Sequence, residues 1–284
     1  MGKEAVVVFL KAGLLGLVEG ITEFLPISST GHMILVDEFM KLTSDKAFDD
    51  AFMVIIQLPA IFAVIVYFWK QVWPFTSDAE TRNVTIVMWT KVVTAFLPAA
   101  VLGFLLHKRI EEYLFNGLTV ALALLAGGVI LLLVERGNGS RRSTIPSVNC
   151  FGYGTALLVG FFQCLAMIPG TSRSAATIIG AMLLGAGRAA AAEFSFFLAI
   201  PTMLGATALT LKKMGAHFTS EQWIVLAIGS AVSFVSAYAV IAAFMTYIRT
   251  RDFKAFGVYR IVLAIIVLAY FSFHGGFAGL LERQ

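Results

Sequence analysis

The sequence predicts an all-α protein that crosses a membrane several times, and three observations support this fold class. The chain is 59% hydrophobic and 13% charged, whereas about a quarter of the residues in soluble domains are charged. Apolar stretches of roughly 20 residues, each long enough to cross a bilayer, recur along the chain. These stretches also lack the period-2 alternation of membrane strands, so we expect helices. They lie at 51–69, 87–106, 118–134, 192–211, 223–248 and 258–273.

Composition also excludes several functions. The net charge of +4 comes from a few loop clusters, so the basic face needed to bind nucleic acid is absent. Cys150 and Cys164 are too few for a disulfide framework and lack CxxC spacing. The first apolar stretch contains Glu19 and Glu23 and has no small-residue cleavage pattern, so we expect it to remain in the mature protein.

Two segments, 6–36 and 151–187, are too long for one crossing and are broken in the middle. The first is broken by Pro26-Ile-Ser-Ser-Thr-Gly31, and the second by Pro169-Gly-Thr-Ser. Irregular backbone at membrane depth is tolerated where it packs in protein or lines a cavity. Each segment is therefore predicted to be a re-entrant broken hairpin that enters and leaves on one side of the membrane.

The two segments also resemble each other. GLVEGITEFLPISST, from Gly16, matches GFFQCLAMI-PGTSR, from Gly160, with one gap. This alignment pairs Glu19 with Gln163 and places Arg173 at the position of Thr30. A second match in the same order joins AFMVIIQLPAIFAVI, residues 51–65, to EFSFFLAIPTMLGAT, residues 193–207. Two ordered matches predict an internal repeat.

We interpret 1–284 as a single membrane domain, with 1–140 as the first structural repeat and 141–284 as the second. One hairpin and about three transmembrane helices in each half give an odd number of crossings, which predicts an inverted repeat.

The orientation follows from loop charges. Under the positive-inside rule, the basic loops Arg136 to Arg142 and Arg249 to Lys254 are cytoplasmic. The acidic loop 37–50 and the mouth of the first hairpin are then outside. Lys212 and Lys213 also fall outside, against the rule.

Glu19 and Glu23 are the first candidate site residues. They are four residues apart in an otherwise apolar stretch, so they project from one helix face. Two carboxylates at this depth repel each other unless a cation, a proton or water compensates them. A solvated position at a helix end is the structural alternative.

Ser28, Ser29 and Thr30 follow in the loop, and His32 comes three residues after Ser29. Backbone amides at the start of a helix, together with hydroxyl groups, bind phosphate well, although an ordinary capping turn has the same composition. The spacing lets the Ser29 hydroxyl and the His32 imidazole meet across one helical turn, as an activated nucleophile requires.

Arg173 lies in the second loop, between Ser172 and Ser174, and 151–187 contains no other charged residue. Its planar guanidinium is suited to bidentate phosphate binding. It can also neutralise Glu19 or Glu23 from the other hairpin, and a ligand phosphate can be inserted between them.

The motifs EGITEFLPISSTGH, residues 19–32, and PGTSRSAAT, residues 169–177, resemble those of the bacterial undecaprenyl-pyrophosphate phosphatases of the bacitracin-resistance type. The similarity covers the whole chain, and Ala175 replaces a Gly found in many relatives. The resemblance implies a bacterial inner-membrane enzyme that hydrolyses undecaprenyl pyrophosphate to undecaprenyl phosphate and inorganic phosphate. Such an enzyme recycles the lipid carrier of cell-wall synthesis and confers bacitracin resistance, with its site opening outward.

The resemblance also implies site residues and a cofactor. The catalytic set is Ser29, His32, Glu23 and Arg173. Substrate binding falls to Ser28, Thr30, Ser172, Ser174 and Arg173. Glu19 and Glu23 would hold a divalent cation, Mg²⁺ or alternatively Ca²⁺. Ser29 is expected to attack the terminal phosphorus while His32 takes its proton, with His32 itself or water as alternative nucleophiles.

The main alternative function is a polyprenyl-phosphate transporter or flippase, because broken hairpins in inverted repeats are also found in transporters. A carrier, however, has no use for an adjacent hydroxyl and imidazole. The lipid tail is expected to leave through a lateral cleft lined by residues such as Phe24, Phe161 and Phe162. The sequence leaves open whether the protein is a homodimer.

Overall fold

The computed structural model describes residues 3–138, 143–214 and 218–281, and these segments are helical and contain no β-strand. Seven of their helical segments are long and apolar enough to cross a membrane, so the protein is an all-α, multi-pass membrane protein. The candidate spans are Glu4–Thr22, Lys46–Tyr67, Ala79–Leu106, Gly117–Gly137, Arg188–Lys213, Ser220–Ile248 and Lys254–Phe273.

The helices of the first half follow the predicted order. They are α1 (Lys3–Thr22), α2 (Ser29–Phe39), α3 (Lys46–Ile55), α4 (Gln57–Tyr67), α5 (Trp69–Val72), α6 (Ala79–Leu114) and α7 (Gly117–Asn138). The second half consists of η1 (Val148–Cys150), α8 (Tyr153–Cys164), η2 (Leu165–Met167), α9 (Arg173–Leu183), α10 (Arg188–Met214), α11 (Ser220–Ile248) and α12 (Lys254–Leu281). Each of the six predicted spans falls on one helix, except 51–69, which is divided among α3, α4 and the start of α5.

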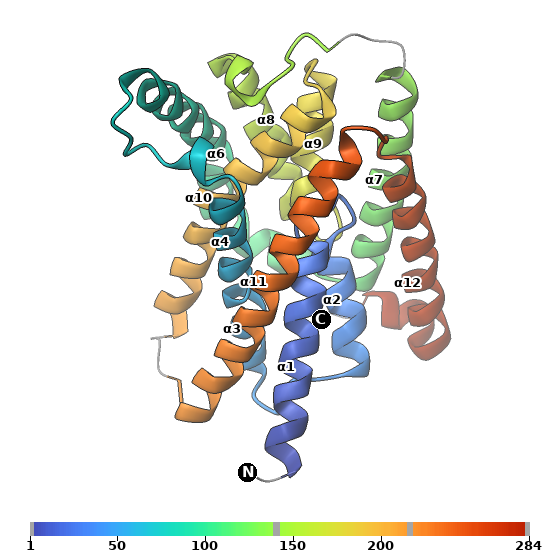
Figure 1. Ribbon diagram of the computed structural model, residues 1–284. Helices are drawn as coiled ribbons and strands as arrows, with labels where there is room; N and C mark the ends of the chain where they lie inside the picture. Colours follow the sequence, from blue (N-terminus) through green and yellow to red (C-terminus); the bar gives the residue numbers. More distant parts are fainter. Residues whose placement is uncertain (1–2, 139–142, 215–217, 282–284) are drawn as a thin grey trace.

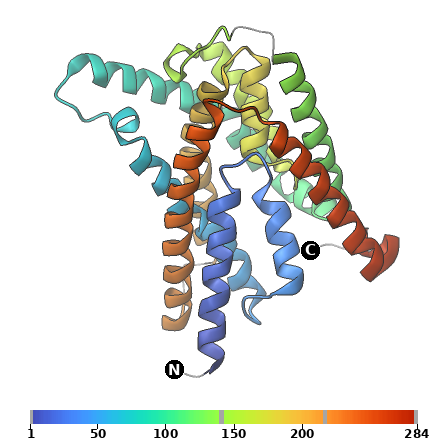
Figure 2. The same cartoon turned by 45° about the vertical axis from the view of Figure 1, so that its right-hand side comes forward.

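The segment 6–36 breaks where Pro26 predicted, between α1 and α2. Figure 2 shows α1 and α2 side by side and antiparallel, with their connecting loop well inside the bundle. The first helix of this segment, α1, is however longer than expected for one arm of a hairpin. Because α1 begins at Lys3 and is continuous to Thr22, it is by length a seventh candidate span. The corresponding arm of the second segment, α8, has only 12 residues.

Close packing of α1 on α11 fixes the position of the first loop. Gly16 and Gly20 are one turn apart and face Gly229 and Ser236 of α11. A methyl group on Gly16 would lie 2.3 Å from the Gly229 carbonyl oxygen. Small residues at this spacing let two helix backbones approach, which is a main source of helix association in lipid.

An ion pair with a buried carboxylate joins three segments at one end of the bundle. Arg188, at the start of α10, donates three hydrogen bonds to the Glu135 carboxylate near the end of α7, the shortest of them 2.5 Å long. The same carboxylate accepts the backbone N–H of Phe253, in the α11–α12 loop, at 3.0 Å. The end of α7 and the α11–α12 loop therefore lie together, as Figure 1 also shows at the top of the view. The predicted basic loops share this end, although residues 139–142 lie outside the described part of the chain.

We predict that Gly16→Ala destabilises the protein by about 1–3 kcal/mol, because the added methyl group forces α1 away from the α11 backbone. The measurement is the thermal unfolding midpoint in detergent. Gly154→Ala in α8 is the matched control, since a methyl group there meets nothing within 4 Å. If Gly16→Ala lowers the unfolding midpoint no more than Gly154→Ala does, the close packing of α1 on α11 is contradicted.

Candidate functional site

The candidate site lies where the loop after α1 meets the start of α9. The Ser174 hydroxyl donates a 2.8 Å hydrogen bond to the Leu25 carbonyl oxygen, which ties the two loops directly. Leu25 precedes α2 and Ser174 is in the first turn of α9, so the N-termini of both helices are at this junction. The first amides of a helix have no partner within the helix and carry partial positive charge. The junction is therefore suited to an anion.

Both loops end in the same unusual conformation. Ser28 caps α2 with a φ of 73°, and Ser172 caps α9 with a φ of 69°. Each side chain accepts the backbone N–H three residues on, Gly31 or Ala175, at 3.2 Å. A positive φ strains residues other than glycine by about 1–3 kcal/mol. These strained caps orient the first turns of both helices.

These caps correct the sequence alignment by one residue. The alignment with a gap placed Arg173 at the position of Thr30. The structure makes Arg173 the first residue of α9, the position that Ser29 has in α2. Without the gap, the two capping serines, Ser28 and Ser172, align with each other. The gap had been placed so that the two prolines aligned. Pro26 is two residues before its capping serine, whereas Pro169 is three residues before its own, so aligning the prolines shifts the serines by one position.

Glu23, Ser29 and Arg173 form one hydrogen-bonded group. The Ser29 hydroxyl donates to one oxygen of the Glu23 carboxylate at 2.5 Å. Arg173 donates to the other oxygen at 3.1 Å, and its second terminal nitrogen donates to the Ser195 carbonyl oxygen at 2.9 Å. The carboxylate thus touches both the predicted nucleophile and the predicted phosphate-binding cation.

Glu19 lies one turn before Glu23 and is 1% exposed. Its carboxyl group interacts electrostatically with Glu23 and Arg173, yet its Oε1 atom is buried without a hydrogen-bond partner. A buried carboxylate oxygen without a partner is costly. The structural alternative, a solvated helix end, does not fit this degree of burial.

The expected contact between Ser29 and His32 is not among the hydrogen bonds of the described residues. Both imidazole nitrogens have other partners: Nδ1 is 2.7 Å from the Ser28 carbonyl oxygen, and Nε2 is 2.6 Å from the Tyr259 hydroxyl. Because a carbonyl oxygen only accepts, Nδ1 donates, and in the neutral imidazole Nε2 then accepts from Tyr259. The spacing of three residues was compatible with a contact to Ser29, but the ring points to α12 instead.

The remaining predicted substrate-binding residues differ in accessibility. Thr30 is exposed beside the site. Ser174 is completely buried and its hydroxyl is engaged with Leu25 and with Ser172. Ser28 and Ser172 are engaged as caps. In the structure, therefore, these three serines hold the loops in place, and Thr30 is the accessible hydroxyl.

Comparison with known proteins agrees with the motifs. The family model described as bacitracin resistance protein BacA matches residues 12–266. The chain belongs to this family. An undecaprenyl-diphosphatase 1 of Clostridioides difficile is 52% identical over 263 residues, which cover 92% of this chain and 95% of the relative. Proteins named undecaprenyl-diphosphatase from Limosilactobacillus fermentum and Fusobacterium nucleatum are 50% and 53% identical, and cover 93% and 90% of this chain and 97% of each relative.

Arg260 is a residue of this BacA-family protein that the sequence reasoning missed. It is completely buried in α12, and it donates to five backbone carbonyl oxygens at 3.0–3.4 Å. They belong to Pro26, Ala123, Leu124, Gly170 and Thr171. Pro26 is in the first loop, and Gly170 and Thr171 are in the second. One guanidinium thus holds both loops against α7. The sequence feature that could have identified Arg260 is its charge, which lies within the apolar stretch 258–273.

Gly127 of α7 makes room for this guanidinium, since a methyl group there would be 2.2 Å from an Arg260 terminal nitrogen.

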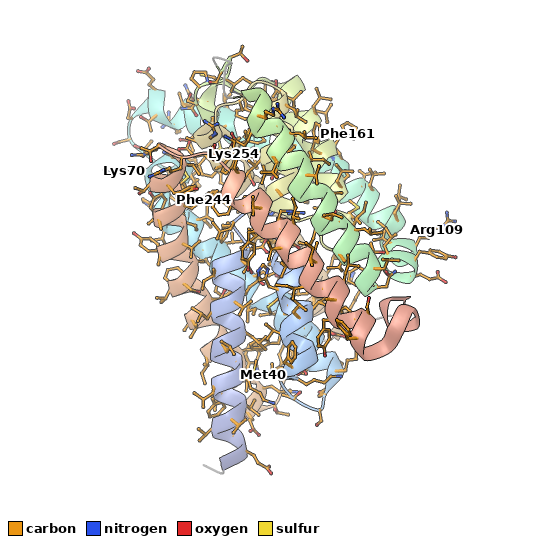
Figure 3. All side chains as sticks on the ribbon, turned by 90° about the vertical axis from the view of Figure 1, so that its right-hand side faces the viewer. Met40, Lys70, Arg109, Phe161, Phe244 and Lys254 are labelled. Atoms are coloured by element: carbon orange, nitrogen blue, oxygen red, sulfur yellow. The ribbon has the colours of Figure 1, made fainter. Side chains whose placement is uncertain are left out.

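The aromatic residues expected to line a lipid cleft do not do so together. Phe24 is completely buried and packs edge-on against Phe196. Phe161 is exposed on the outside of the bundle, as Figure 3 shows, and Phe162 packs against Gly180. The abundance of phenylalanine in this sequence made the choice of these three positions weak.

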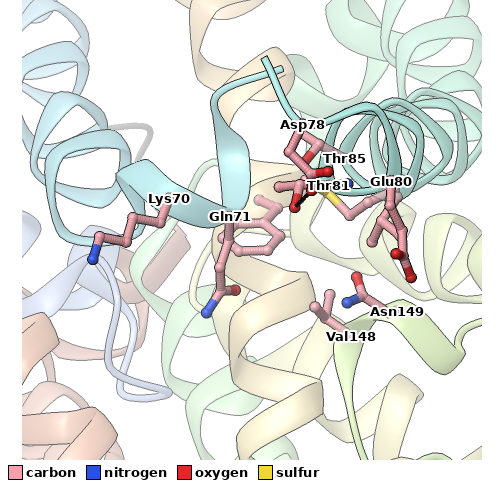
Figure 4. Close-up of a pocket in the computed structure, with 11 residues that line it drawn as sticks. Lys70, Gln71, Asp78, Glu80, Thr81, Thr85, Val148 and Asn149 are labelled. Atoms are coloured by element: carbon pink, nitrogen blue, oxygen red, sulfur yellow. Dashed lines mark hydrogen bonds between the residues drawn. The ribbon is translucent and has the colours of Figure 1, made fainter. Parts of the chain in front are cut away.

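A polar cavity of about 280 Å³ lies away from the junction of the two loops. Its walls include Lys70, Asp78, Glu80 and Asn149, and Figure 4 shows them between α5, the start of α6 and η1. It contains none of the predicted site residues.

We predict that Arg260→Met lowers the free energy of unfolding by about 3 kcal/mol or more, because several buried carbonyl oxygens lose their donor. The thermal unfolding midpoint in detergent measures this. Arg251→Met, at an exposed position, is the matched control. If both variants unfold at the wild-type midpoint, Arg260 does not hold the loops.

Proposed function

We propose that the protein is an integral membrane phosphatase that hydrolyses undecaprenyl pyrophosphate to undecaprenyl phosphate and inorganic phosphate. It would recycle the lipid carrier of cell-wall synthesis and confer bacitracin resistance. The observation that carries the proposal is the Ser29–Glu23–Arg173 group, in which one carboxylate contacts a hydroxyl and a guanidinium between two helix N-termini. The names of the relatives, undecaprenyl-diphosphatase, support the same reaction.

Substrate binding is assigned to the groups that converge at the junction. The terminal phosphate would approach the amides at the N-termini of α2 and α9 and share the Arg173 guanidinium with Glu23. Ser195 fixes the guanidinium from the other side through its carbonyl oxygen. Thr30, which is exposed beside Ser29, is available to the phosphate oxygens.

The carboxyl groups fit a Mg²⁺ ion. Glu19 has a buried oxygen without a hydrogen-bond partner and is one turn from Glu23. Within the described segments no three acidic, histidine or cysteine side chains cluster around a metal site. Two protein carboxylates completed by water and substrate phosphates are typical of Mg²⁺, whereas Ca²⁺ prefers six to eight oxygen ligands. When bound there, the ion would supply charge neutralisation for the pyrophosphate.

The hydrogen bond between Ser29 and Glu23 supports a proton transfer to Glu23. Ser29 Oγ attacks the terminal phosphorus, and its proton passes to the Glu23 oxygen that it already contacts at 2.5 Å. The bond between that phosphorus and the bridging oxygen breaks, and the lipid monophosphate leaves. Water then attacks the phosphoserine and releases inorganic phosphate, while Ser29 regains a proton. Arg173 stabilises the phosphoryl charge throughout.

This assignment changes the role expected for His32. Its Nε2 atom forms a 2.6 Å hydrogen bond with the Tyr259 hydroxyl and its Nδ1 atom lies 2.7 Å from the Ser28 carbonyl oxygen, so both ring nitrogens are engaged away from Ser29. Direct attack by His32 would require one of these bonds to break. Direct attack by water remains the alternative in which Ser29 only binds substrate.

The carrier alternative makes a different demand on the site. A carrier needs charge compensation, which Arg173 provides, but it gains nothing from a short hydrogen bond between a hydroxyl and a carboxylate. The Ser29–Glu23 contact therefore favours the enzyme.

We also infer that the two halves form an inverted repeat with two re-entrant hairpins. Three pairs of features support it: the caps Ser28 and Ser172 share one conformation; Gly16 meets the backbone of α11, and Gly160 meets that of α6; and Glu19 and Gln163 are both buried with an unpartnered polar atom. Contacts between helices follow the same symmetry, because α1 and α4 pack on α11 while α8 and α10 pack on α6.

We predict that phosphate release from undecaprenyl pyrophosphate requires Mg²⁺, stops with EDTA, and falls at least about a thousandfold in Ser29→Ala, as in other enzymes that lose a nucleophile. Glu23→Gln is expected to lower kcat by about 100-fold or more, because the Ser29 proton loses its acceptor. Purified protein in detergent is assayed for inorganic phosphate.

Ser147→Ala, in a loop away from the site, is the matched control for Ser29→Ala. Wild-type rates in Ser29→Ala would reject Ser29 as nucleophile. No release by the wild-type protein under any condition would reject the phosphatase and favour the carrier.

The proposed location is the bacterial inner membrane with the first hairpin opening outward, and thiol labelling tests the orientation. We predict that Ser44→Cys, in a Cys150→Ser background, reacts with a membrane-impermeant maleimide on the outer face, since it is exposed in the acidic loop. The exposed native Cys150 is expected to react only from the cytoplasmic face. The reverse pattern in right-side-out vesicles would invert the orientation.

A further inference from the structure

An apolar groove of about 450 Å³ runs between α1 and α12, and the α1–α12 groove is the name used for it below. Val18, Ile21 and Leu25 line one wall, and Ala255 and Phe256 line the other. Its volume lies within the range of about 300–1,000 Å³ of ligand pockets. Both helices are candidate membrane spans, so the groove lies at the depth of lipid chains.

The groove and the carboxylates occupy neighbouring faces of α1. Successive residues of a helix are about 100° apart, so Val18 and Thr22 stand one step around the helix from Glu19 and Glu23. Thr22 donates its hydroxyl to the Val18 carbonyl oxygen at 2.7 Å, which satisfies that polar group within the helix. An apolar chain can therefore lie along one face while its charged end is bound on the next.

His32 and Tyr259 also line the groove. Their rings are stacked, with centroids 5.5 Å apart and planes 7° apart, and they share the 2.6 Å hydrogen bond. His32 is also three residues from Ser29, which contacts Glu23. The groove thus reaches the candidate site through His32, which lines the groove and whose Nδ1 atom contacts the carbonyl oxygen of Ser28, the residue before Ser29.

We propose that the α1–α12 groove binds the first isoprene units of the lipid pyrophosphate, those nearest to the phosphates. This inference rests on the proposed function. The occupant is an apolar chain carrying a pyrophosphate, because no Asp, Glu, Lys or Arg lines the groove, while Glu19 and Glu23 lie on the neighbouring face of α1. Neither Phe161 nor Phe162, the positions expected from the sequence, borders this groove.

We expect the groove to orient the lipid substrate by its shape, without adding hydrophobic binding energy. A lipid tail is already in hydrocarbon, so its transfer into the groove removes no apolar surface from water. The gain is orientation, because a chain held between Ile21 and Ala255 fixes the direction from which the phosphates reach Ser29. Filling the groove should therefore impair the lipid substrate without disturbing the hydrogen-bonded group at Glu23.

Photo-cross-linking tests the groove directly. The probe is a farnesyl methylenediphosphonate, which cannot be hydrolysed at the bridge, with a diazirine in its first isoprene unit. On wild-type protein we expect the label on residues 18–27 and 255–259, reduced at least tenfold by excess undecaprenyl pyrophosphate. Competed labelling elsewhere, for instance on α8 near Phe161, would overturn the proposal, as would labelling that undecaprenyl pyrophosphate does not reduce.

Two substitutions fill the groove from opposite walls. Ile21→Trp and Ala255→Trp, both at lipid-exposed positions, are each expected to lower groove labelling and kcat/KM for undecaprenyl pyrophosphate at least tenfold. Ile265→Trp, 58% exposed on α12 and outside the groove, is the matched control and should stay within twofold of wild type. Unchanged labelling and kcat/KM in either folded variant would also overturn the proposal.

The outcomes separate this inference from the proposed function. Phosphate release by wild-type protein, with label outside the groove, rejects the groove alone. Competed label in the groove without phosphate release rejects the phosphatase alone and leaves a lipid-pyrophosphate binding site. If a tryptophan variant does not fold, the labelling map of the wild-type protein still decides.

Discussion

The ion pair between Glu23 and Arg173 is the interaction on which the arrangement of the site depends. Each charge comes from a different broken segment of the chain, and each alone would cost several kcal/mol in an apolar surrounding. Their 3.1 Å contact compensates both. Because the pair forms only when the two loops meet, the charges and the fold require each other. Arg173 donates no hydrogen bond to Glu19, whose buried Oε1 atom has no partner, and for this reason the proposed cation is assigned to Glu19.

The polar groups around this pair have different tasks. Ser28 and Ser172 cap helices α2 and α9, and Ser174 joins the two loops through its hydrogen bond to Leu25. Arg260 holds the loop carbonyl oxygens from behind. The hydroxyl groups of Ser29 and Thr30 are not used in this way, and they are the ones to which the proposed function assigns chemistry and binding. Strained caps and a buried guanidinium make the junction rigid, which is what positioning of a transferring phosphoryl group requires.

The helices outside the junction supply close packing and the apolar groove proposed to bind the lipid. Small residues on α1 bring its backbone against α11, so the carboxylates face inward. The neighbouring face of α1 then points toward α12, and the apolar groove lies between these two helices. The fold thus separates a polar junction, where charge is compensated, from an apolar groove between α1 and α12.

The sequence by itself determined the membrane class, the positions of the helices, the two broken segments and most residues of the site. Apolar length and isolated charges are local properties that lipid constrains strongly, so they can be read without a structure. Only the tertiary structure decided that Ser29 contacts Glu23 while His32 turns to Tyr259, and that Arg173 corresponds to Ser29 rather than Thr30. Arg260 and the α1–α12 groove also depend on it. These features join residues up to 234 positions apart, and a pairing between distant side chains is fixed by how the helices pack, about which local spacing says nothing.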